Sequence, residues 1–361
     1  MVIQTQTRRT IRPFTERDYP AYVAVVNATF PDYATSVEAL RFGDSNRDPR
    51  CRQERFIAAV GGTIVGVGSY DQWAGMYHPR KFAIDVTIRP EWQGLGAALY
   101  ERVMVALEPF APLAVRSQGR ADLERGIRFL QARGFVEGMR SWESRLAVAD
   151  FDPIPFAGAE ERVAAGGIAI RTILELAGDP ARDRKLYELD QELFADVPSP
   201  EPHTRIPFEQ FAARRLGDPD MIPEAYYIAI DAATGEYAGM GQLWHSSASA
   251  DLYNGLTAVR RAYRRRGIAL ALKLRGIAYA QTIGAPTIKT WNETNNQGML
   301  AINEALGFVK QPVWIDFVKT LRDEDESGIR KTLRNEGEAD MHSTSHDESG
   351  AGNERRTARN P

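Results

Sequence analysis

Two short segments of the chain place small residues where a strand is expected to turn into a helix. The first reads Gln-Gly-Leu-Gly-Ala-Ala over residues 93–98, and the second reads Arg-Arg-Arg-Gly-Ile-Ala over residues 264–269. Gly96 and Gly267 occupy the same place in the two segments. The first turn of a helix has backbone N–H groups without partners, and small residues let a diphosphate approach those groups. Both segments are therefore candidate pyrophosphate-binding turns.

The candidate binding residues of each turn follow from this chemistry. A tight turn without a ligand would use the same small residues, so one such turn alone is a weak signal. In the second turn three arginines add positive charge, which favours phosphate contact over a solvated surface patch. The candidates in the first turn are Gln93, Gly94, Gly96, Ala97 and Ala98. The candidates in the second turn are Arg264, Arg265, Arg266, Gly267, Ile268 and Ala269.

Two other phosphate-binding motifs do not match these turns. A dinucleotide-binding fingerprint needs Gly-x-Gly-x-x-Gly directly after the first strand of its unit. Here each turn follows the fourth expected strand, and the second turn has one glycine. A Walker motif needs Gly-Lys-Ser or Gly-Lys-Thr, which neither turn contains.

Each turn lies at the same place in a longer repeat. Both halves are expected to contain a strand, an amphipathic helix, a hairpin, a strand that leads into the turn, a helix after it, and a last helix that ends at Gly-Phe. In the first half the expected positions are 10–14, 19–30, 56–67, 82–88, 97–107 and 121–135. In the second half they are 168–172, 183–194, 227–240, 252–259, 268–283 and 295–308.

The repeat and the local composition define the expected domains. We predict an N-terminal domain over residues 8–150, a linker over 151–165 and a C-terminal domain over 166–322. Residues 323–361 are polar and carry few apolar side chains, which predicts a disordered tail.

Composition narrows the function class. The net charge of −3 gives no global attraction to nucleic acid or to an anionic membrane, so neither is an expected partner. Cys51 is the only cysteine, which rules out an intramolecular disulfide and a cysteine-based metal site, and we expect no metal. The chain shows no signal-peptide pattern and no apolar run of membrane-spanning length, so we expect a cytoplasmic protein.

The order of the elements, the Gln/Arg-x-x-Gly-x-Ala turn and the final Gly-Phe pair resemble the GNAT superfamily of N-acetyltransferases. The resemblance covers residues 8–148 and 166–321 in a tandem architecture, for which mycothiol synthase is an architectural relative. It implies an α/β (α+β) fold of two tandem GNAT-like units, each a mixed, mostly antiparallel twisted sheet flanked by helices. In this family the turn binds the pyrophosphate of acetyl-CoA, and the pantetheine arm lies between two splayed strands.

The same resemblance assigns further cofactor contacts in the second half. Its strand amides at Thr257, Ala258 and Val259 correspond to the pantetheine-binding strand. Asn292 and Asn296 correspond to contacts beyond the next strand, and Asn296 is equally well explained as a helix N-cap. Because the first half lacks this second set of residues, we expect the second half to be the active one.

The implied reaction is direct acyl transfer from acetyl-CoA to an amine, without a covalent enzyme intermediate. The family places a tyrosine four residues before the final glycine, as the acid that protonates the thiolate. Those positions hold Leu130 and Asn303, so the acid is in doubt, and Asn303 could only donate a hydrogen bond. Tyr253 and His245 are candidate bases, although packing and surface exposure explain them equally well.

We expect the acceptor to be a small-molecule amine bound by the loops at 32–48 and 195–207. We expect the protein to be a monomer or a homodimer.

Two alternative functions remain open. One is a non-catalytic sensor or scaffold that binds acyl-CoA, suggested by the missing tyrosines. The other is an aminoacyl-tRNA-dependent transferase of the same tandem fold, which the acidic net charge disfavours.

Overall fold

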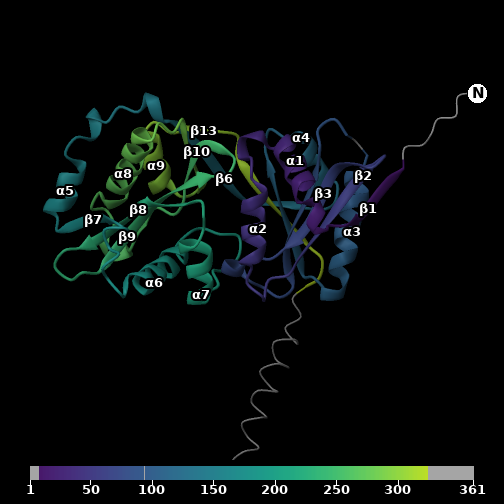
Figure 1. The fold of residues 1–361 in the computed structure, drawn as a ribbon, viewed down its shortest axis with the longest axis horizontal. Helices are drawn as coiled ribbons and strands as arrows, with labels where there is room; N and C mark the ends of the chain where they lie inside the picture. The colour runs from purple at the N-terminus through teal and green to yellow at the C-terminus, as the bar shows by residue number, and fades with distance from the viewer. Residues whose placement is uncertain (1–7, 93, 324–361) are drawn as a thin grey trace, which may run out of the picture. The chain divides into compact units, whose positions relative to one another are not determined.

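The computed structural model describes residues 8–92 and 94–323, and its residues as far as Leu321 belong to one compact unit (Figure 1). The main elements of the first half are β1 (Arg9–Pro13), α1 (Tyr19–Thr29), α2 (Val37–Ser45), β2 (Gln53–Val60), β3 (Thr63–Asp71), β4 (Lys81–Ile88), α3 (Gly96–Leu107), β5 (Ala114–Arg120), α4 (Glu124–Gln131) and β6 (Val136–Ala147). Those of the second half are α5 (Ala159–Ala165), β7 (Ile168–Thr172), α6 (Arg182–Phe194), α7 (Phe208–Phe211), the π-helix η7 (Ala212–Leu216), β8 (Met221–Asp231), β9 (Tyr237–Ser246), β10 (Ser249–Asn254), β11 (Ala258–Val259), α8 (Ile268–Thr282), β12 (Thr287–Glu293), α9 (Gln297–Ala305), β13 (Val309–Lys310) and β14 (Trp314–Thr320).

The strands of both halves, within the described residues, form one sheet in the order β1-β2-β3-β4-β5-β14-β6-β12-β10-β9-β8-β7. Pairings are antiparallel except for β4 with β5 and β10 with β12, which are parallel. Alternate residues of β2 point to opposite faces: Phe56 packs in the core under α3, and Ile57 packs with Tyr22 and Val25 of α1. The predicted fold class, a mixed and mostly antiparallel sheet flanked by helices, is confirmed.

The two halves exchange their last strands. β14, from the end of the second half, lies between β5 and β6 of the first half. β6 is 12 residues long, and its later part pairs with β12 of the second half from Ser141 to Ala147. As a result, Phe317 and Ile315 of β14 belong to the first-half core, and Leu146 of β6 belongs to the second-half core. Each half completes the core of the other.

We predict that Phe317→Ala destabilises the first half, although residue 317 is near the end of the second. The Phe317 side chain is fully buried, and truncating a buried phenylalanine costs about 3–5 kcal/mol. Urea unfolding would measure the free energy, and hydrogen exchange would locate it, with faster exchange in β4 and α3. Val309→Ala, at a position 64% exposed on β13, is the matched control. Faster hydrogen exchange confined to α8 and β9 would contradict the assignment of β14 to the sheet of the first half.

Two segments differ from the sequence expectation. The strand expected at 252–259 is interrupted between β10 and β11. Gly255 lies in this interruption and approaches the Trp244 indole so closely that a Cβ would lie 2.4 Å from its Nε1. The segment expected to be a linker contains α5, whose Val163 and Ala159 are buried in the second-half core. Apart from Asp323, the predicted tail lies outside the described residues.

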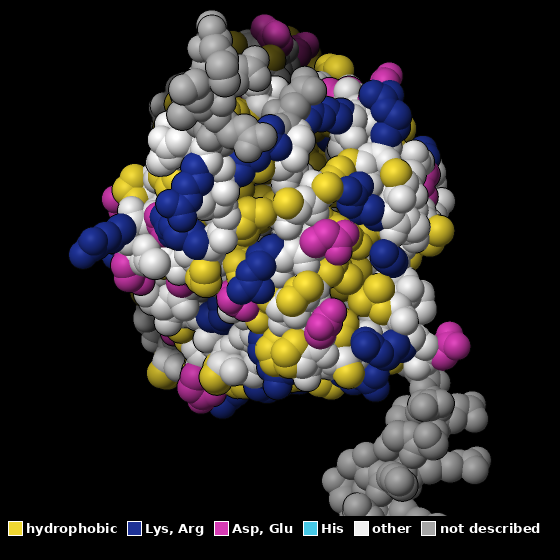
Figure 2. Space-filling view, turned by 90° about the vertical axis from the view of Figure 1, so that its right-hand side faces the viewer, with side chains coloured by type: hydrophobic (Ala, Val, Ile, Leu, Met, Phe, Trp, Pro, Cys, Tyr) yellow, Lys and Arg dark blue, Asp and Glu magenta, His cyan; other side chains and the backbone are white. Residues whose placement is uncertain are grey.

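The face of the first half shown in Figure 2 carries side chains of both charges. Lysine and arginine side chains lie beside acidic ones, with hydrophobic side chains between them. On this face the charges are thus interspersed and do not form one continuous basic surface.

Candidate active site

A cavity lies where β4 and β5 of the first half separate. The strands pair in parallel only from Lys81 to Ala83 on β4 and from Ala114 to Arg116 on β5. Beyond these residues β4 continues as far as Ile88, while the two strands diverge. The gap opens into a cavity of about 350 Å³ with a mainly apolar lining. Its residues come from both strands, from α3 and α4, and from the end of α1.

The start of α3 borders this cavity. Gly94 has φ +81°, which favours glycine, and Gly96 is the first residue of α3 and lines the cavity. A Cβ on Gly96 would lie 3.3 Å from the Phe129 ring, so the glycine keeps space open beside the helix start. The first helical hydrogen bond here runs from the Leu99 amide to Leu95, which leaves the preceding amides free of helical acceptors. This geometry fits a diphosphate.

The other predicted residues of this turn contribute no polar side chain that the structure describes. Ala97 and Ala98 lie in the first turn of α3, where their small side chains keep the amides accessible. Gln93 lies outside the described residues. Arg125, on α4, also lines the cavity and brings a positive charge that sequence reasoning missed.

Two polar side chains in the cavity are suited to proton transfer. Asp85 faces the cavity from β4 and accepts a hydrogen bond from the Thr87 hydroxyl at 2.7 Å. Although the cavity exposes Asp85, surrounding protein raises the pKa of this carboxyl, because it favours the neutral acid. Tyr100, on α3, lines the same cavity, and Lys319 donates a hydrogen bond to its hydroxyl at 3.2 Å. Leu130 also lines it, so the family's tyrosine position is in place but carries leucine.

The corresponding strands of the second half have a buried lysine at the point where they separate. β10 and β12 pair in parallel at Leu252 and Tyr253 and then diverge. Lys273, from α8, is buried and donates a hydrogen bond to Asn254 Oδ1 at 3.1 Å. Its ammonium group lies 5.2 Å from the centre of the Phe308 ring. A buried lysine thus lies at the point where β10 leaves β12, between Asn254 and Phe308.

The second turn also differs from the first in shape. Arg265 has φ +66° where the first turn has Gly94, and Gly267 has φ +79° and is the N-cap of α8. Ile268 and Ala269 are the first two residues of that helix. Both turns therefore have a left-handed residue at this position, which is strained for an arginine. They differ in that α3 begins at Gly96, whereas α8 begins one residue after Gly267.

Carboxylates already pair with most of the arginines around the second turn. Asp196 accepts hydrogen bonds from Arg261 and Arg264, at 3.1 Å for the Arg261 Nε. Arg260 pairs with Glu192 at 3.0 Å, and Arg266 donates to the Gly166 carbonyl. The predicted phosphate contacts of Arg264 and Arg266 therefore compete with groups of the protein itself.

The remaining predicted cofactor residues have structural roles in this state. Thr257 exchanges hydrogen bonds with Asn254, and Ala258 and Val259 pair with β9. Asn296 is the N-cap of α9 and accepts a hydrogen bond from the Met299 amide, which confirms that part of its prediction.

The three predicted catalytic residues are not brought together. The ring of Tyr253 lies 5.7 Å from that of Trp291 on one face of the sheet. The β9 residue that pairs with Tyr253 is followed by His245, whose exposed side chain points to the opposite face. Asn303 is buried in α9, where its amide donates to Asn292 Oδ1 at 2.7 Å. Their roles stay predictions without support from mutual geometry.

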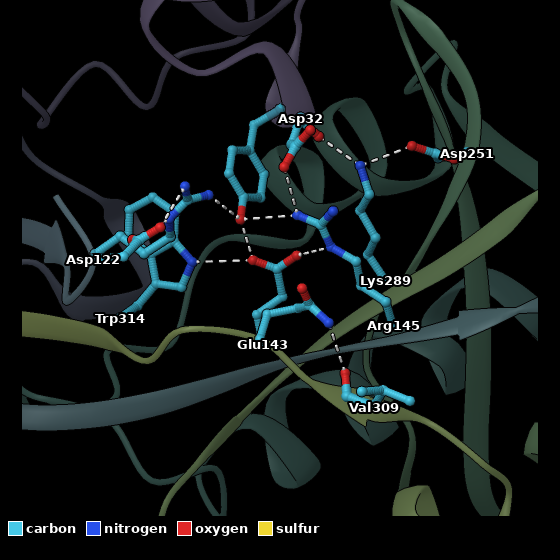
Figure 3. A network of polar contacts seen from close by, with 11 residues as sticks. Asp32, Asp122, Glu143, Arg145, Asp251, Lys289, Val309 and Trp314 are labelled. Carbon is cyan, nitrogen blue, oxygen red and sulfur yellow. Dashed lines mark hydrogen bonds and ion pairs between the residues drawn. The ribbon is translucent and has the colours of Figure 1, made fainter.

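A network of charges fills the centre of the sheet, where the exchanged strands meet (Figure 3). Glu143 of β6 is fully buried and accepts hydrogen bonds from Tyr33, from Trp314 at 3.2 Å and from Arg145 at 2.6 Å. Arg145 also bonds to Asp32 at 3.0 Å. Trp314 lines the first-half cavity, so this network supports one of its walls.

The loop at 195–207, expected to shape a second-half acceptor site, packs on the first half. The Thr204 amide donates to the Gly75 carbonyl at 2.8 Å. Glu201 pairs with Arg116 at 3.1 Å and with Lys81 at 3.2 Å, at the base of the separated strands. The second half therefore contributes to the surroundings of the first-half cavity.

We predict that Lys273 makes the free energy of unfolding increase as the pH rises from neutral to alkaline. Burial lowers the pKa of Lys273 from 10.5 to about 7, so between these values the unfolded chain binds more protons than the folded one. The free energy of unfolding should rise with pH in this window, by up to about 1.4 kcal/mol per pH unit. Urea unfolding from pH 7 to 9.5 would show this slope in the wild type and its loss in Lys273→Met. Lys185→Met, at a half-exposed ion pair, is the control; an unchanged slope in Lys273→Met would disprove the assignment.

Comparisons with known proteins define the class. The chain is similar in structure to a GCN5-related N-acetyltransferase from Sphaerobacter thermophilus, with a TM-score of 0.64 and 19% identity over 88% of this chain and 97% of that one. It is also similar to a tandem GNAT protein from the clavulanic acid biosynthesis pathway, with a TM-score of 0.69 and 17% identity over 88% of this chain and all of that one. The protein thus has a tandem GNAT fold.

The sequence comparison identifies the family of a domain within the second half. Residues 184–308 match the model of the Acetyltransferase (GNAT) family, so the chain carries a GNAT acetyltransferase domain, and acyl transfer is the chemistry of that family. No curated protein sequence matches the chain. The family match and the open cavity lie in different halves: the second half keeps the family's sequence pattern, and the first half has the open space.

Two searches of the described residues bear on other classes of site. Within residues 8–92 and 94–323, no group of three or more His, Cys, Asp or Glu side chains is placed to hold a metal ion. In the same part of the chain no helix is both long enough and apolar enough to cross a membrane.

Proposed function

We propose that the protein is an acetyl-CoA-dependent N-acetyltransferase that acylates a small-molecule amine in the cavity of the first half. The observation that carries the proposal is that the glycine turn at Gly96 and the carboxyl group of Asp85 line one space of about 350 Å³. From the sequence alone, we expected the second half to contain the active site. We prefer the first because the buried Lys273 lies where the second gap begins and because Asp196 pairs with Arg264 of the second turn and with the neighbouring Arg261.

The residues of the cavity fit acetyl-CoA. The amides at the start of α3 would hold the diphosphate, with Arg125 nearby. The edge of β4 from Ile84 to Ile88, which lines the cavity beyond the β4–β5 pairing, would offer hydrogen bonds to the amides of a pantetheine arm. The mainly apolar lining suits the rest of that arm.

Asp85 and Tyr100 have distinct roles in this proposal. Acetyl-CoA supplies a thioester carbonyl, at which the C–N bond to the amine forms as the C–S bond breaks. Asp85 accepts the proton that the amine loses, and its raised pKa brings it closer to that of the amine. Tyr100 donates a proton to the departing sulfur, and Lys319 beside its hydroxyl stabilises the resulting phenolate. Tyr100 thus replaces the family's tyrosine, which is Leu130 here.

Two other functions have less support from the structure. The leucine at the tyrosine position favours a sensor that binds acyl-CoA without turnover, and this remains the second candidate. For an aminoacyl-tRNA substrate, the interspersed charges in Figure 2 offer no continuous basic surface on that face. We therefore propose a small amine as acceptor.

The test has a binding step and a turnover step. Calorimetric titration with acetyl-CoA is expected to give one bound molecule per chain, and thiol release over a panel of primary amines is expected to exceed hydrolysis. Absence of binding would refute the proposal, and binding without thiol release from any amine would favour the sensor. Binding lost in Gly267→Asp but kept in Gly96→Asp would move the site to the second half.

A further inference from the structure

A second cleft of the first half is lined in part by a residue of the second half. It has a volume of about 280 Å³ and lies between α2 and the ends of β2 and β3. Asp71 and Arg55 line its sheet side, Arg47 lines its α2 side, and Arg214 reaches it from η7. The cleft is thus formed by both halves and contains charges of both signs.

The acidic end of the cleft faces the proposed reaction site. Asp71 lies on β3 opposite Ala83 of β4, and Asp85 lies two residues further along β4, so both carboxyls are on the same face of the sheet. Burial raises the pKa of Asp71, and no described side chain donates a hydrogen bond to it. Asp44, in contrast, accepts hydrogen bonds from Arg55 at 2.8 Å and from Tyr19 at 2.7 Å. Asp71 is therefore the carboxyl in this cleft that is left for a ligand.

The basic end of the cleft is an arginine in an unusual backbone. Arg214 is part of the single-turn π-helix Ala212–Leu216, a form that is rare and is frequently found at functional sites. Burial, with Arg215 and Arg47 nearby, lowers the pKa of Arg214. Within the described part of the chain no carboxylate pairs with its guanidinium. The charge of Asp218 acts on this guanidinium without forming a direct ion pair. A partly buried guanidinium without a direct ion pair is unfavourable, and an anionic group of a ligand would offset that cost.

We propose that the acceptor is an amino acid or a similar zwitterion, whose carboxylate binds Arg214 and whose amino group lies between Asp71 and Asp85. This inference rests on the proposed function and adds the substrate class. The two unpaired ends have opposite charge, as a zwitterion requires. A guanidinium fork matches a carboxylate through two parallel hydrogen bonds, and the small volume suits a compact molecule. The second half then has a defined role, because it supplies the anchor for the acceptor of the first half.

The experiment compares each amino acid with its decarboxylated amine: phenylalanine with phenethylamine, lysine with cadaverine, and histidine with histamine. The wild type is expected to prefer at least one amino acid over its amine in kcat/KM by 10-fold or more. Arg214→Gln should remove that preference through a higher KM for the amino acid, with kcat/KM for the amine and the affinity for acetyl-CoA unchanged. Arg214→Lys should keep part of the preference, since the charge remains.

Arg215→Gln is the matched control, because Arg215 lies next in the chain but stacks over the Phe194 ring at 5.3 Å and does not line this cleft. It should leave the preference intact. Turnover of amines with no preference for a carboxylate would overturn this inference and leave the proposed function standing. An equal loss with amino acid and amine in Arg214→Gln would also overturn it. Failure of every substrate to release thiol would remove the proposed function and this inference together.

Discussion

Gly96→Asp is expected to weaken acetyl-CoA binding by about 100-fold or more. The new carboxylate would stand at the start of α3, beside the amides proposed to hold the diphosphate. At about 4 Å, two like charges near a protein surface repel by about 4 kcal/mol. Aspartate is well tolerated at a helix N-terminus, so the fold should be retained. Calorimetric titration with acetyl-CoA would measure the loss of affinity.

Two control variants separate charge from bulk and first half from second. Gly96→Asn adds the same volume without charge; because a Cβ here would already lie 3.3 Å from Phe129, a smaller loss is expected. Gly267→Asp places the same charge in the second turn, where Gly267 has φ +79° and aspartate is among the residues that accept a left-handed backbone. It should leave acetyl-CoA affinity unchanged. Equal losses in Gly96→Asn and Gly96→Asp would mean that no anion binds at this turn.

Asp85→Asn is expected to lower kcat by about 10² to 10⁴, the usual contribution of a general base, with acetyl-CoA affinity preserved. The carboxylate is the active form, and the surrounding protein raises its pKa although the cavity exposes the side chain. The wild-type kcat should therefore rise with pH, with a midpoint above the ordinary pKa of aspartate, because the protonated carboxyl cannot act as the base. This ascending limb should be absent in Asp85→Asn.

The pH profile distinguishes a base from a structural carboxyl. A residue that only supported the cavity wall would lower kcat without moving the ascending limb, and would also weaken acetyl-CoA binding. Thr87→Val removes the hydrogen bond to Asp85 at 2.7 Å and should shift the limb to higher pH, because that bond stabilises the carboxylate. A profile of Asp85→Asn that keeps the wild-type limb would exclude Asp85 as the base.

The family resemblance could be derived from sequence because its signals are local. A glycine turn between a strand and a helix, a hairpin with glycine and a helix that ends at Gly-Phe each depend on neighbours along the chain. Asn296 as a helix cap is a signal of the same kind, and the structure places it there. The bounds of α3 and α8 agree with the expected positions to within one residue.

The choice between the halves depends on contacts that no local pattern encodes. The arginines of the second turn looked like phosphate ligands, but Asp196, far earlier in the sequence, pairs with Arg264 of this turn and with the neighbouring Arg261. Lys273 has no marker in sequence that would place its ammonium group against Asn254 at the end of β10. Tyr100 was not chosen from sequence, because only the fold brings this helix residue to the cavity that Asp85 of β4 also lines.

The sequence by itself determined the repeated unit, its order of elements and the glycine turns, since these follow from short-range hydrogen bonding and periodicity. The tertiary structure alone decided that the halves exchange β6 and β14, that one strand gap is open while a buried lysine lies at the other, and that Arg214 of the second half lines a cleft of the first. The physical reason is that burial and ion pairing are set by residues far apart in the chain. Which groups pair, and which stay available to a ligand, becomes defined only when the sheet is assembled.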